Sequence, residues 1–276
     1  MNGKVFLIGA GPGDPELLTL KALKRLQSAD VVLHDELIGR EILALVKPSA
    51  HVRSVGKRCG RQGITQNEIN SLLIAFASFG VNVARLKGGD PSIFGRSGEE
   101  TAALRLAGIE FEIVPGVTSA LASAAAAQVS LTHRDQAHAV LLISNHLAKS
   151  GTLPWRSYVE SGATLVIYMP GFDYEQIAGR LQGAGMRAET PCAVVSRVST
   201  PEQQILRTTL NRLPRSSRLP APTLLVVGEV LRNVEVEAGA GRYAWSTTGP
   251  GLSTEISALL ASAQTQPLRG DQEHEL

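Results

Sequence analysis

Residues 86–100, which read L-K-G-G-D-P-S-I-F-G-R-S-G-E-E, constrain the fold of this chain more than any other stretch. They follow residues 81–86, whose β-branched side chains and alternation predict a strand, and they lead into residues 101–107, whose apolar spacing predicts a helix. The stretch is therefore predicted to be a strand-to-helix loop. In open α/β sheets, ligands bind beyond the carboxyl ends of the strands, where such loops lie.

The composition of this loop favours a binding role over a plain connection. Gly88 and Gly89 remove two β-carbons at the turn, so that a ligand can approach the bare backbone and meet its N–H groups. Asp90 and Pro91 follow as a stiff acidic corner. Charged side chains then surround the apolar pair Ile93-Phe94, and we interpret the loop as a ligand-binding segment.

Ser97 and Glu100 fit the capping-box pattern, in which a Ser or Thr side chain and a Glu three residues later each accept a bond from the other's backbone N–H. This predicts that the next helix begins there. Arg96 would then lie just outside the helix and Glu99 in its first turn, with both side chains free to point into a cleft.

A second box, formed by Thr65 and Glu68, predicts a helix with Ile69, Leu72, Leu73 and Phe76 on its inner face. Near the N-terminus, Asp14 is expected to cap a helix that starts at Pro15 and has an apolar stripe: Leu17, Leu20, Leu23 and Leu26.

Alternating strands and helices place the chain in the α/β class. In the first half, strands at residues 4–9, 30–34, 81–86 and 109–114 are separated by helices, which predicts a mostly parallel sheet covered by helices. A small-residue helix at 120–127 follows, with Thr118 as its expected cap. The second half has a helix at 173–182 and closely spaced strands, which predict a mixed sheet: 139–144, 164–168, 191–196, 203–207 and 223–227. We expect domains at 1–115 and 116–235, followed by a polar, mobile tail at 236–276.

Composition argues against several classes of protein. The 276 residues carry a net charge of +2, which is too mild to indicate nucleic acid binding. Cys59 and Cys192 are far apart and lack metal-ligand spacing, which favours a reducing compartment. The first residues lack the regions of a signal peptide, and no run of about 18 apolar residues predicts a membrane span. We therefore expect a soluble cytoplasmic protein with neither a nucleic acid nor a membrane partner.

Two other site types fit the sequence poorly. Gly9-x-Gly11 after the first strand imitates a dinucleotide-binding fingerprint, but Asp14 occupies the position of the third small residue. His133, His138 and His146 have spacings that fit no usual metal site. We therefore expect no metal.

Several motifs, in order, closely resemble the uroporphyrinogen-III C-methyltransferases, which are class III S-adenosylmethionine-dependent enzymes of the tetrapyrrole methylase superfamily. The resemblance covers about residues 4–230 and is carried by these segments: V-F-L-I-G-A-G-P-G-D-P-E-L-L-T-L-K-A, V-G-K-R, Q-N-E-I-N, R-L-K-G-G-D-P-S-I-F-G-R-S-G-E-E, V-P-G-V-T-S-A and L-T-H-R-D. It implies two α/β domains with the active site in the trough between them, usually in a homodimer.

The resemblance also implies an activity. Methyl groups would pass from S-adenosylmethionine to C2 and C7 of uroporphyrinogen III, which would give precorrin-2 by way of precorrin-1. That product feeds sirohaem, cobalamin or haem d1 synthesis. A methylase acting on another tetrapyrrole, such as a later precorrin, and a non-catalytic protein that keeps the cofactor site are the alternatives.

Residue roles are carried over only at matching positions. Matching positions imply cofactor contacts from Pro12, Gly88, Gly89, Asp90, Ile93, Thr118, Ser119, Met169 and, in a loop that departs from the usual Asn-Gly, Val198. They imply a catalytic and substrate-binding set made of Asp35 as proton acceptor, Lys57 as proton donor, Arg96 and Glu99 at the substrate, and Arg134 and His146 as further substrate contacts.

The chemistry of these side chains agrees with such roles. A carboxylate such as Asp35 or Glu99 is the conventional base for removing a proton from the macrocycle. Arg96 is a poor base because its pKa lies above 12, so we expect it to orient a substrate carboxylate. Glu36, Asn145 and Val198 depart from the family pattern, and we expect them to alter substrate or cofactor affinity.

Overall fold

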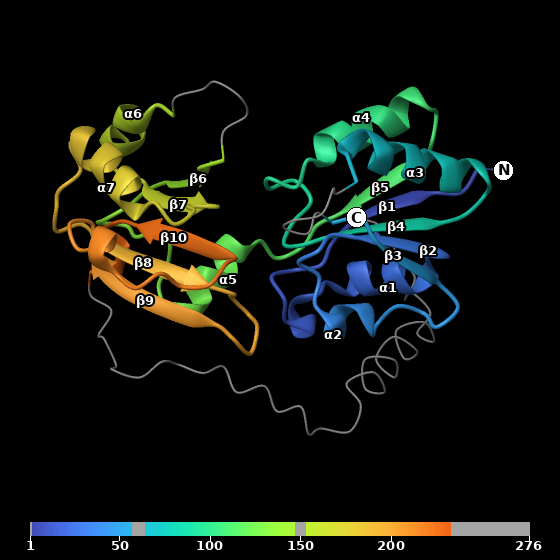
Figure 1. Ribbon diagram of the computed structural model, residues 1–276, viewed down its shortest axis with the longest axis horizontal. Coiled ribbons are helices and arrows are strands. Elements are labelled where there is room, and N and C mark those ends of the chain that lie inside the picture. Colours follow the sequence, from blue (N-terminus) through green and yellow to red (C-terminus); the bar gives the residue numbers. More distant parts are fainter. Residues whose placement is uncertain (1, 57–63, 147–152, 233–276) are drawn as a thin grey trace, which may run out of the picture. The chain divides into compact units, whose positions relative to one another are not determined.

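The computed structural model describes residues 2–56, 64–146 and 153–232, in which the strands form two five-stranded sheets (Figure 1). The first sheet contains β1 (Val5–Gly9), β2 (Val31–His34), β3 (His51–Ser54), β4 (Val83–Lys87) and β5 (Phe111–Val114). Its helices are α1 (Leu20–Ser28), α2 (Arg40–Leu43), α3 (Gln66–Ser78) and α4 (Ser97–Leu106).

The first sheet has the strand order β3-β2-β4-β1-β5, and each of its neighbouring pairs is parallel. Its two faces are covered by different helices (Figure 1). Phe6 and Ile8 of β1 pack with α1 and α2 on one face, whereas Val5 and Leu7 pack with α3 and α4 on the other. The inner strands β1 and β4 are buried at every position, as a parallel sheet between two helical layers requires.

The second sheet has the strand order β6-β7-β10-β8-β9. These strands are β6 (Val140–Ser144), β7 (Thr164–Tyr168), β8 (Pro191–Ser196), β9 (Gln204–Thr209) and β10 (Thr223–Val227). Only β6 and β7 pair in parallel, and the other neighbours are antiparallel, so the predicted mixed sheet is confirmed.

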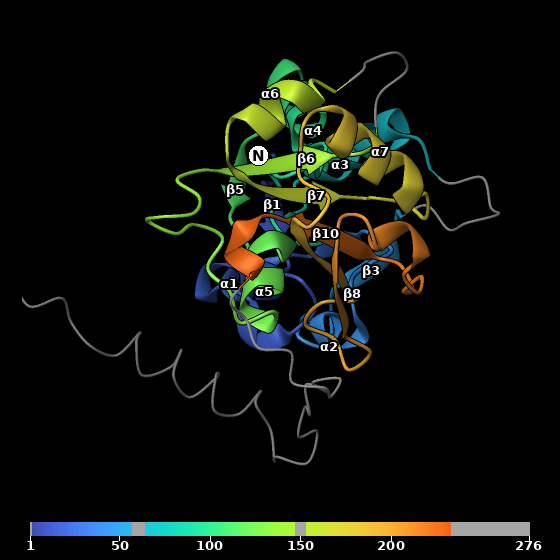
Figure 2. The ribbon, with the colours of Figure 1, turned by 90° about the vertical axis from the view of Figure 1, so that its left-hand side faces the viewer.

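Successive residues of β7 point to opposite faces of the second sheet. Leu165 and Ile167 pack with α6 (Trp155–Glu160) and α7 (Tyr174–Gly183), whereas Val166 and Tyr168 pack with α5 (Ser119–Ala126). Figure 2 shows α5 and the pair α6 and α7 on opposite sides of these strands.

The structure corrects the predicted first helix. Asp14 does act as a cap, since its Oδ1 accepts a bond from the Glu16 N–H at 2.8 Å, but it caps only a 3-10 turn at Pro15–Leu17. The α-helix starts later, where the Thr19 hydroxyl accepts from Ala22 N–H at 3.1 Å. Leu20 is consequently 61% exposed and is not part of the buried stripe.

Among the α-helices and strands of the described residues, three short elements were not predicted from the sequence. They are the helices α2 and α6 and the edge strand β3, whose residues are all exposed. An exposed edge strand lacks the apolar alternation by which half-buried strands are recognised. None of the helices in the described part of the chain is long and apolar enough to cross a membrane.

Candidate active site

The loops that follow β1 and β4 meet at the carboxyl edge of the first sheet. Gly89 N–H donates to the Gly11 carbonyl at 2.7 Å, and Gly11 N–H donates to the Gly89 carbonyl at 3.2 Å. A β-carbon on Gly9 would lie 2.7 Å from the Gly89 oxygen and 2.6 Å from the Gly116 nitrogen. These backbones can approach so closely only because side chains are missing at the contact.

Asp90 joins this contact to the loop after β5. Its Oδ1 accepts from the Ser92 N–H at 2.7 Å, and its Oδ2 accepts from the Gly116 N–H at 3.0 Å. The predicted acidic corner is therefore present, and both carboxylate oxygens hold backbone groups. The structure thus brings together Gly88, Gly89 and Asp90 with the segment that leads to Thr118.

Thr118 occupies the N-cap position of α5, but its side chain makes no capping bond. Its hydroxyl instead lies 2.6 Å from the Tyr168 hydroxyl, which also accepts from the Ala120 N–H at 3.1 Å. The prediction that Thr118 caps this helix was right about position and wrong about the bond. Tyr168, at the end of β7, satisfies the helix terminus and holds the Thr118 side chain.

Several non-glycine residues of the loops have left-handed backbones. Phe94 and Arg96 in the loop after β4 have φ values of 52° and 57°, and Met169 after β7 has a φ of 51°. The Phe94 and Tyr168 rings also lie 4.9 Å apart, edge to face. Such costly backbone conformations cluster at ligand sites, where surrounding contacts hold them in place.

The loop after β8 also contains non-glycine residues with left-handed backbones. Arg197 and Ser199, on either side of Val198, have φ values of 46° and 59°. The Val198 side chain is buried against Ala122 and Val195. A β-carbon on Gly13, next to Pro12, would lie 3.0 Å from the Ser199 oxygen, so the two predicted cofactor loops are in contact.

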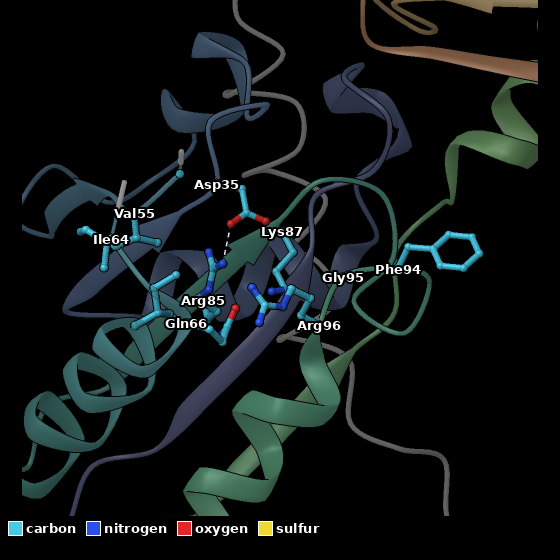
Figure 3. Close-up of a pocket in the computed structure, with 11 residues that line it drawn as sticks. Asp35, Val55, Ile64, Gln66, Arg85, Lys87, Phe94, Gly95 and Arg96 are labelled. Carbon is cyan, nitrogen blue, oxygen red and sulfur yellow. Dashed lines mark hydrogen bonds and ion pairs between the residues drawn. The ribbon is translucent and has the colours of Figure 1, made fainter. Parts of the chain in front are cut away.

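A cavity of about 210 Å³ lies beside the loop after β4 (Figure 3). Its charged wall consists of Asp35, Arg85, Lys87 and Arg96. Its other lining residues are mostly apolar or small: Val55, Gly56, Ile64, Gln66, Ile69, Phe94 and Gly95. Arg96, whose side chain is 52% exposed, gives this wall a cation that an anionic ligand can reach.

Three residues of this wall form an ion cluster with a buried carboxylate beneath it, and we define the cluster as Asp35, Arg85, Lys87 and Glu100. The Glu100 side chain is fully buried, and its Oε1 accepts from Arg85 Nε at 3.0 Å. Lys87 Nζ, with its side chain 2% exposed, donates to both Glu100 oxygens at 3.0 Å. Arg85 Nη2 pairs with Asp35, whose side chain is 34% exposed at the cavity.

The cluster shifts the pKa values of its cations in opposite directions. Burial works against the charge of Arg85, but the carboxylates of Asp35 and Glu100 outweigh it and raise the pKa of the guanidinium. Burial, reinforced by the charge of Arg85, lowers the pKa of the Lys87 ammonium. Glu100 is the carboxylate that both cations share.

This arrangement overturns the capping box predicted for Ser97 and Glu100. The N-cap of α4 is Arg96, and no side chain caps the helix there. Glu100 points to Arg85 and Lys87 because these buried cations offer it bonds that the exposed helix terminus does not match.

Arg96 and Glu99 were expected to point freely into a cleft, but their side chains pair with each other. Arg96 Nε and Nη2 donate to the two Glu99 oxygens, each at 2.7 Å, with both side chains 52% exposed. The hydrogen bonds from Arg96 lower the pKa of Glu99. Of the two, only Arg96 lines the cavity.

The remaining predicted residues are not gathered at the cavity. Arg134 and His146 are exposed, and neither belongs to its lining. Lys57 lies outside the described residues. Within the described ranges, no group of three or more His, Cys, Asp or Glu side chains could hold a metal ion. Cys192 is buried, which raises the pKa of its thiol to about 12.

Arg85, Lys87 and Glu100, which the structure places at or beneath the cavity, were not predicted as site residues from the sequence. A signal was present, because residues 85 and 87 place two cations on one face of a strand that is otherwise apolar. Buried cations in such a strand require a partner, and Glu100 is a carboxylate in the helix that follows.

Comparison with known proteins gives a consistent result. Residues 4–214 match the family model of the Tetrapyrrole (Corrin/Porphyrin) Methylases. The siroheme synthase of Tolumonas auensis is 46% identical over 231 residues, which cover 83% of this chain and 49% of that protein. The chain thus spans about half the length of the curated relatives it matches.

Solved structures are also similar. A uroporphyrin-III C-methyl transferase from Thermus thermophilus, complexed with S-adenyl homocysteine, superposes with a TM-score of 0.74 at 41% identity and covers 83% of this chain and 99% of that one. A cobalt precorrin-4 methyltransferase of cobalamin biosynthesis gives a TM-score of 0.74 at 31% identity, covering 83% and 95% of the two chains.

Proposed function

This chain belongs to the tetrapyrrole (corrin/porphyrin) methylases, and from this premise we propose that it methylates uroporphyrinogen III at C2 and C7 with S-adenosylmethionine, giving precorrin-2 through precorrin-1. The similarity to a uroporphyrin-III C-methyl transferase over 83% of the chain supports this substrate. The similarity to siroheme synthases supports a place in sirohaem synthesis.

The observation that carries the proposal is the cation-lined cavity next to the glycine loop. Arg85, Lys87 and Arg96 face it together with Asp35. Uroporphyrinogen III is rich in carboxylates, and arginine and lysine at a cavity wall attract and orient such groups. Asp35 and Glu100 balance the charges of Arg85 and Lys87, so Arg96 is the exposed cation of this wall that a substrate carboxylate can reach.

The loops near this wall fit the proposed cofactor. Gly88 is exposed, and a β-carbon there would meet only Leu37 within contact range, at 3.9 Å, so the backbone is open to a ligand. We propose that the cofactor is held by Pro12, Gly88, Gly89, Asp90, Ile93, Thr118, Ser119, Met169 and the loop at Val198. When bound, S-adenosylmethionine supplies an electrophilic methyl group.

The chain's own residues would orient the macrocycle and take its proton. A pyrrole carbon gains a methyl group and becomes fully substituted, so the macrocycle must then lose a proton from another position to restore conjugation. Asp35 is the better acceptor, because it lines the cavity, whereas Glu99 does not and has its pKa lowered by Arg96. Arg96 would bind a substrate carboxylate, with Arg134 and His146 as further contacts and Lys57 as proton donor.

One alternative has an observation in its favour. The cobalt precorrin-4 methyltransferase has the same TM-score, 0.74, as the uroporphyrin-III enzyme, although its identity is lower. A later precorrin is therefore the second candidate substrate. We also propose domains at residues 1–115 and 116–235, with the active site in the trough between them. We further propose that the protein is cytoplasmic and forms a homodimer. Light scattering of the purified protein tests the dimer.

An anaerobic incubation with uroporphyrinogen III and methyl-labelled S-adenosylmethionine tests the function. We expect two labelled methyl groups on the oxidised product by mass spectrometry. The Asp35→Asn variant should still bind S-adenosylhomocysteine in calorimetry but should lose turnover. Binding of S-adenosylhomocysteine without transfer by the unmodified chain would reject uroporphyrinogen III and favour the second substrate.

A further inference from the structure

Glu100 has features that a purely stabilising residue does not need. Its carboxylate is fully buried, beneath a cavity whose lining does not include it. Burying two cations and a carboxylate carries a desolvation cost that well-packed apolar residues of similar volume avoid. The charges in this cluster therefore call for a role beyond packing.

Arg85 is held on every side of its guanidinium. Nε donates to Glu100 at 3.0 Å, Nη1 donates to the carbonyls of Leu33 and Leu86 at 3.4 and 3.3 Å, and Nη2 pairs with Asp35. A planar guanidinium with acceptors on all three nitrogens has a fixed orientation.

Glu100 is itself anchored from two elements besides its own helix. Lys87 of β4 bonds both its oxygens, and Gln66 Nε2 of α3 donates to its Oε1 at 3.3 Å. Gln66 Nε2 also donates to Asn70 at 3.2 Å, which holds the amide in place. The chain of contacts thus runs from α3 and α4 through Arg85 to the cavity.

We propose that Arg85 and Glu100 are positioning residues for the methylation. Glu100 orients the guanidinium of Arg85, and Arg85 holds the Asp35 carboxylate at the cavity, toward the carbon that releases its proton. This inference rests on the proposed function, since it names the residues that act on the proposed acceptor. Neither Arg85 nor Glu100 needs to transfer a proton.

The variant Arg85→Lys separates charge from orientation. Lysine keeps the positive charge, but a single ammonium lacks the fork that spans Glu100 and Asp35 together. Because small misplacements of a reacting group are costly, we expect kcat to fall about 10²-fold, with the KM for uroporphyrinogen III changed less than about threefold. Affinity for S-adenosylhomocysteine should stay the same.

Arg25→Lys is the matched control. Arg25 Nε donates to Glu112 at 2.8 Å, the same kind of arginine–carboxylate bond, but on α1 and away from the cavity. This variant should keep the kcat of the unmodified chain. A kcat for Arg85→Lys within about twofold of that of Arg25→Lys would overturn the proposal, as would a rise in KM without a fall in kcat.

A double-mutant cycle tests whether Arg85 and Glu100 act through the same contact. Glu100→Asp keeps the charge but withdraws the carboxylate, so it should lower kcat through the same atoms as Arg85→Lys. The kcat of the double variant should then be no more than about twofold below that of the worse single variant, because the two residues act in series. Additive losses would overturn the serial arrangement.

Crystal structures of the unmodified chain and Arg85→Lys give a readout independent of turnover. In the unmodified chain we expect one orientation of the Asp35 carboxylate. In Arg85→Lys we expect that carboxylate to be rotated or to occupy two alternate conformations. An unchanged Asp35 would overturn the positioning role. Failure of the unmodified chain to methylate uroporphyrinogen III would instead reject the proposed function, which keeps the two failures distinguishable.

Discussion

Residues 65–68 and 97–100 have the same Ser/Thr-x-x-Glu pattern at the start of a helix, yet their glutamates behave differently. At α3, the Thr65 hydroxyl accepts from the Glu68 N–H at 3.2 Å, and the Thr65 N–H donates to the Glu68 carboxylate at 2.6 Å. At α4, no such bonds form, and Glu100 turns inward to Arg85 and Lys87.

The difference shows that a local motif competes with the environment of the strand beside it. Glu68 is exposed, so the helix terminus is its best partner. Glu100 lies against β4, where two buried cations would otherwise have only the partly exposed carboxylate of Asp35 as counter-charge. Where local and tertiary partners compete, the buried charges decide because their desolvation cost is larger.

Removing each glutamate's charge should therefore have unequal effects. Glu100→Gln leaves Arg85 and Lys87 short of a carboxylate in a buried site, and we expect a loss of about 3–5 kcal/mol in the free energy of unfolding, measured with urea. Glu68→Gln, the matched control, should lose far less. Equal losses in the two variants would contradict the distinction between cap and cluster.

The charge-balanced double variant Lys87→Met/Glu100→Gln sharpens this test. It removes one cation together with the carboxylate, so it should recover about 1–3 kcal/mol of the stability that Glu100→Gln loses. A double variant less stable than the single would show that the cost comes from lost packing and not from the unpaired charge.

For the residues at the cap positions, we expect the larger loss of stability at α3 and the smaller one at α4, the reverse of the order for the two glutamates. Thr65→Ala removes a capping hydroxyl and should cost about 1 kcal/mol in the same urea titration. Ser97→Ala removes no capping bond and should change the stability by less than about 0.5 kcal/mol. A larger loss at Ser97 would indicate a cap at α4 after all.

The smallest effect concerns the titration of Glu68. The hydrogen bonds from the backbone and then the side chain of Thr65 lower its pKa. A lowered pKa in the folded state means that Glu68 adds stability above its unfolded pKa and loses it as the pH falls through the folded pKa.

Carboxyl NMR titration should place the Glu68 pKa below the ordinary glutamate value. In Thr65→Ala it should move part of the way back, because only the side-chain bond is lost and the backbone bond remains. A pKa unchanged by Thr65→Ala would show that the hydroxyl contributes nothing to the box.

Much of the fold follows from local patterns. The alternation of strands and helices in the first half predicted the α/β class and the parallel first sheet, and the closely spaced late strands predicted the mixed second sheet. The exposed strand β3 could not be found this way, because its burial pattern carries no alternation.

The contacts of the candidate site were predictable where neighbours in the sequence form them. Gly88, Gly89 and Asp90 are next to one another in the sequence, and their loop chemistry indicated a binding segment. The Glu100–Arg85 bond joins positions 15 residues apart, and the Thr118–Tyr168 contact joins positions 50 apart. Only the packing of helices and strands decides such partners.

The most direct test of the account is the position of the transferred methyl groups. After anaerobic turnover of uroporphyrinogen III with carbon-13-methyl S-adenosylmethionine, NMR of the product should show two labelled methyl groups, one at C2 and one at C7. Label at any other carbon, or no label while S-adenosylhomocysteine still binds, would contradict the claim that this cation-lined cavity serves uroporphyrinogen III methylation.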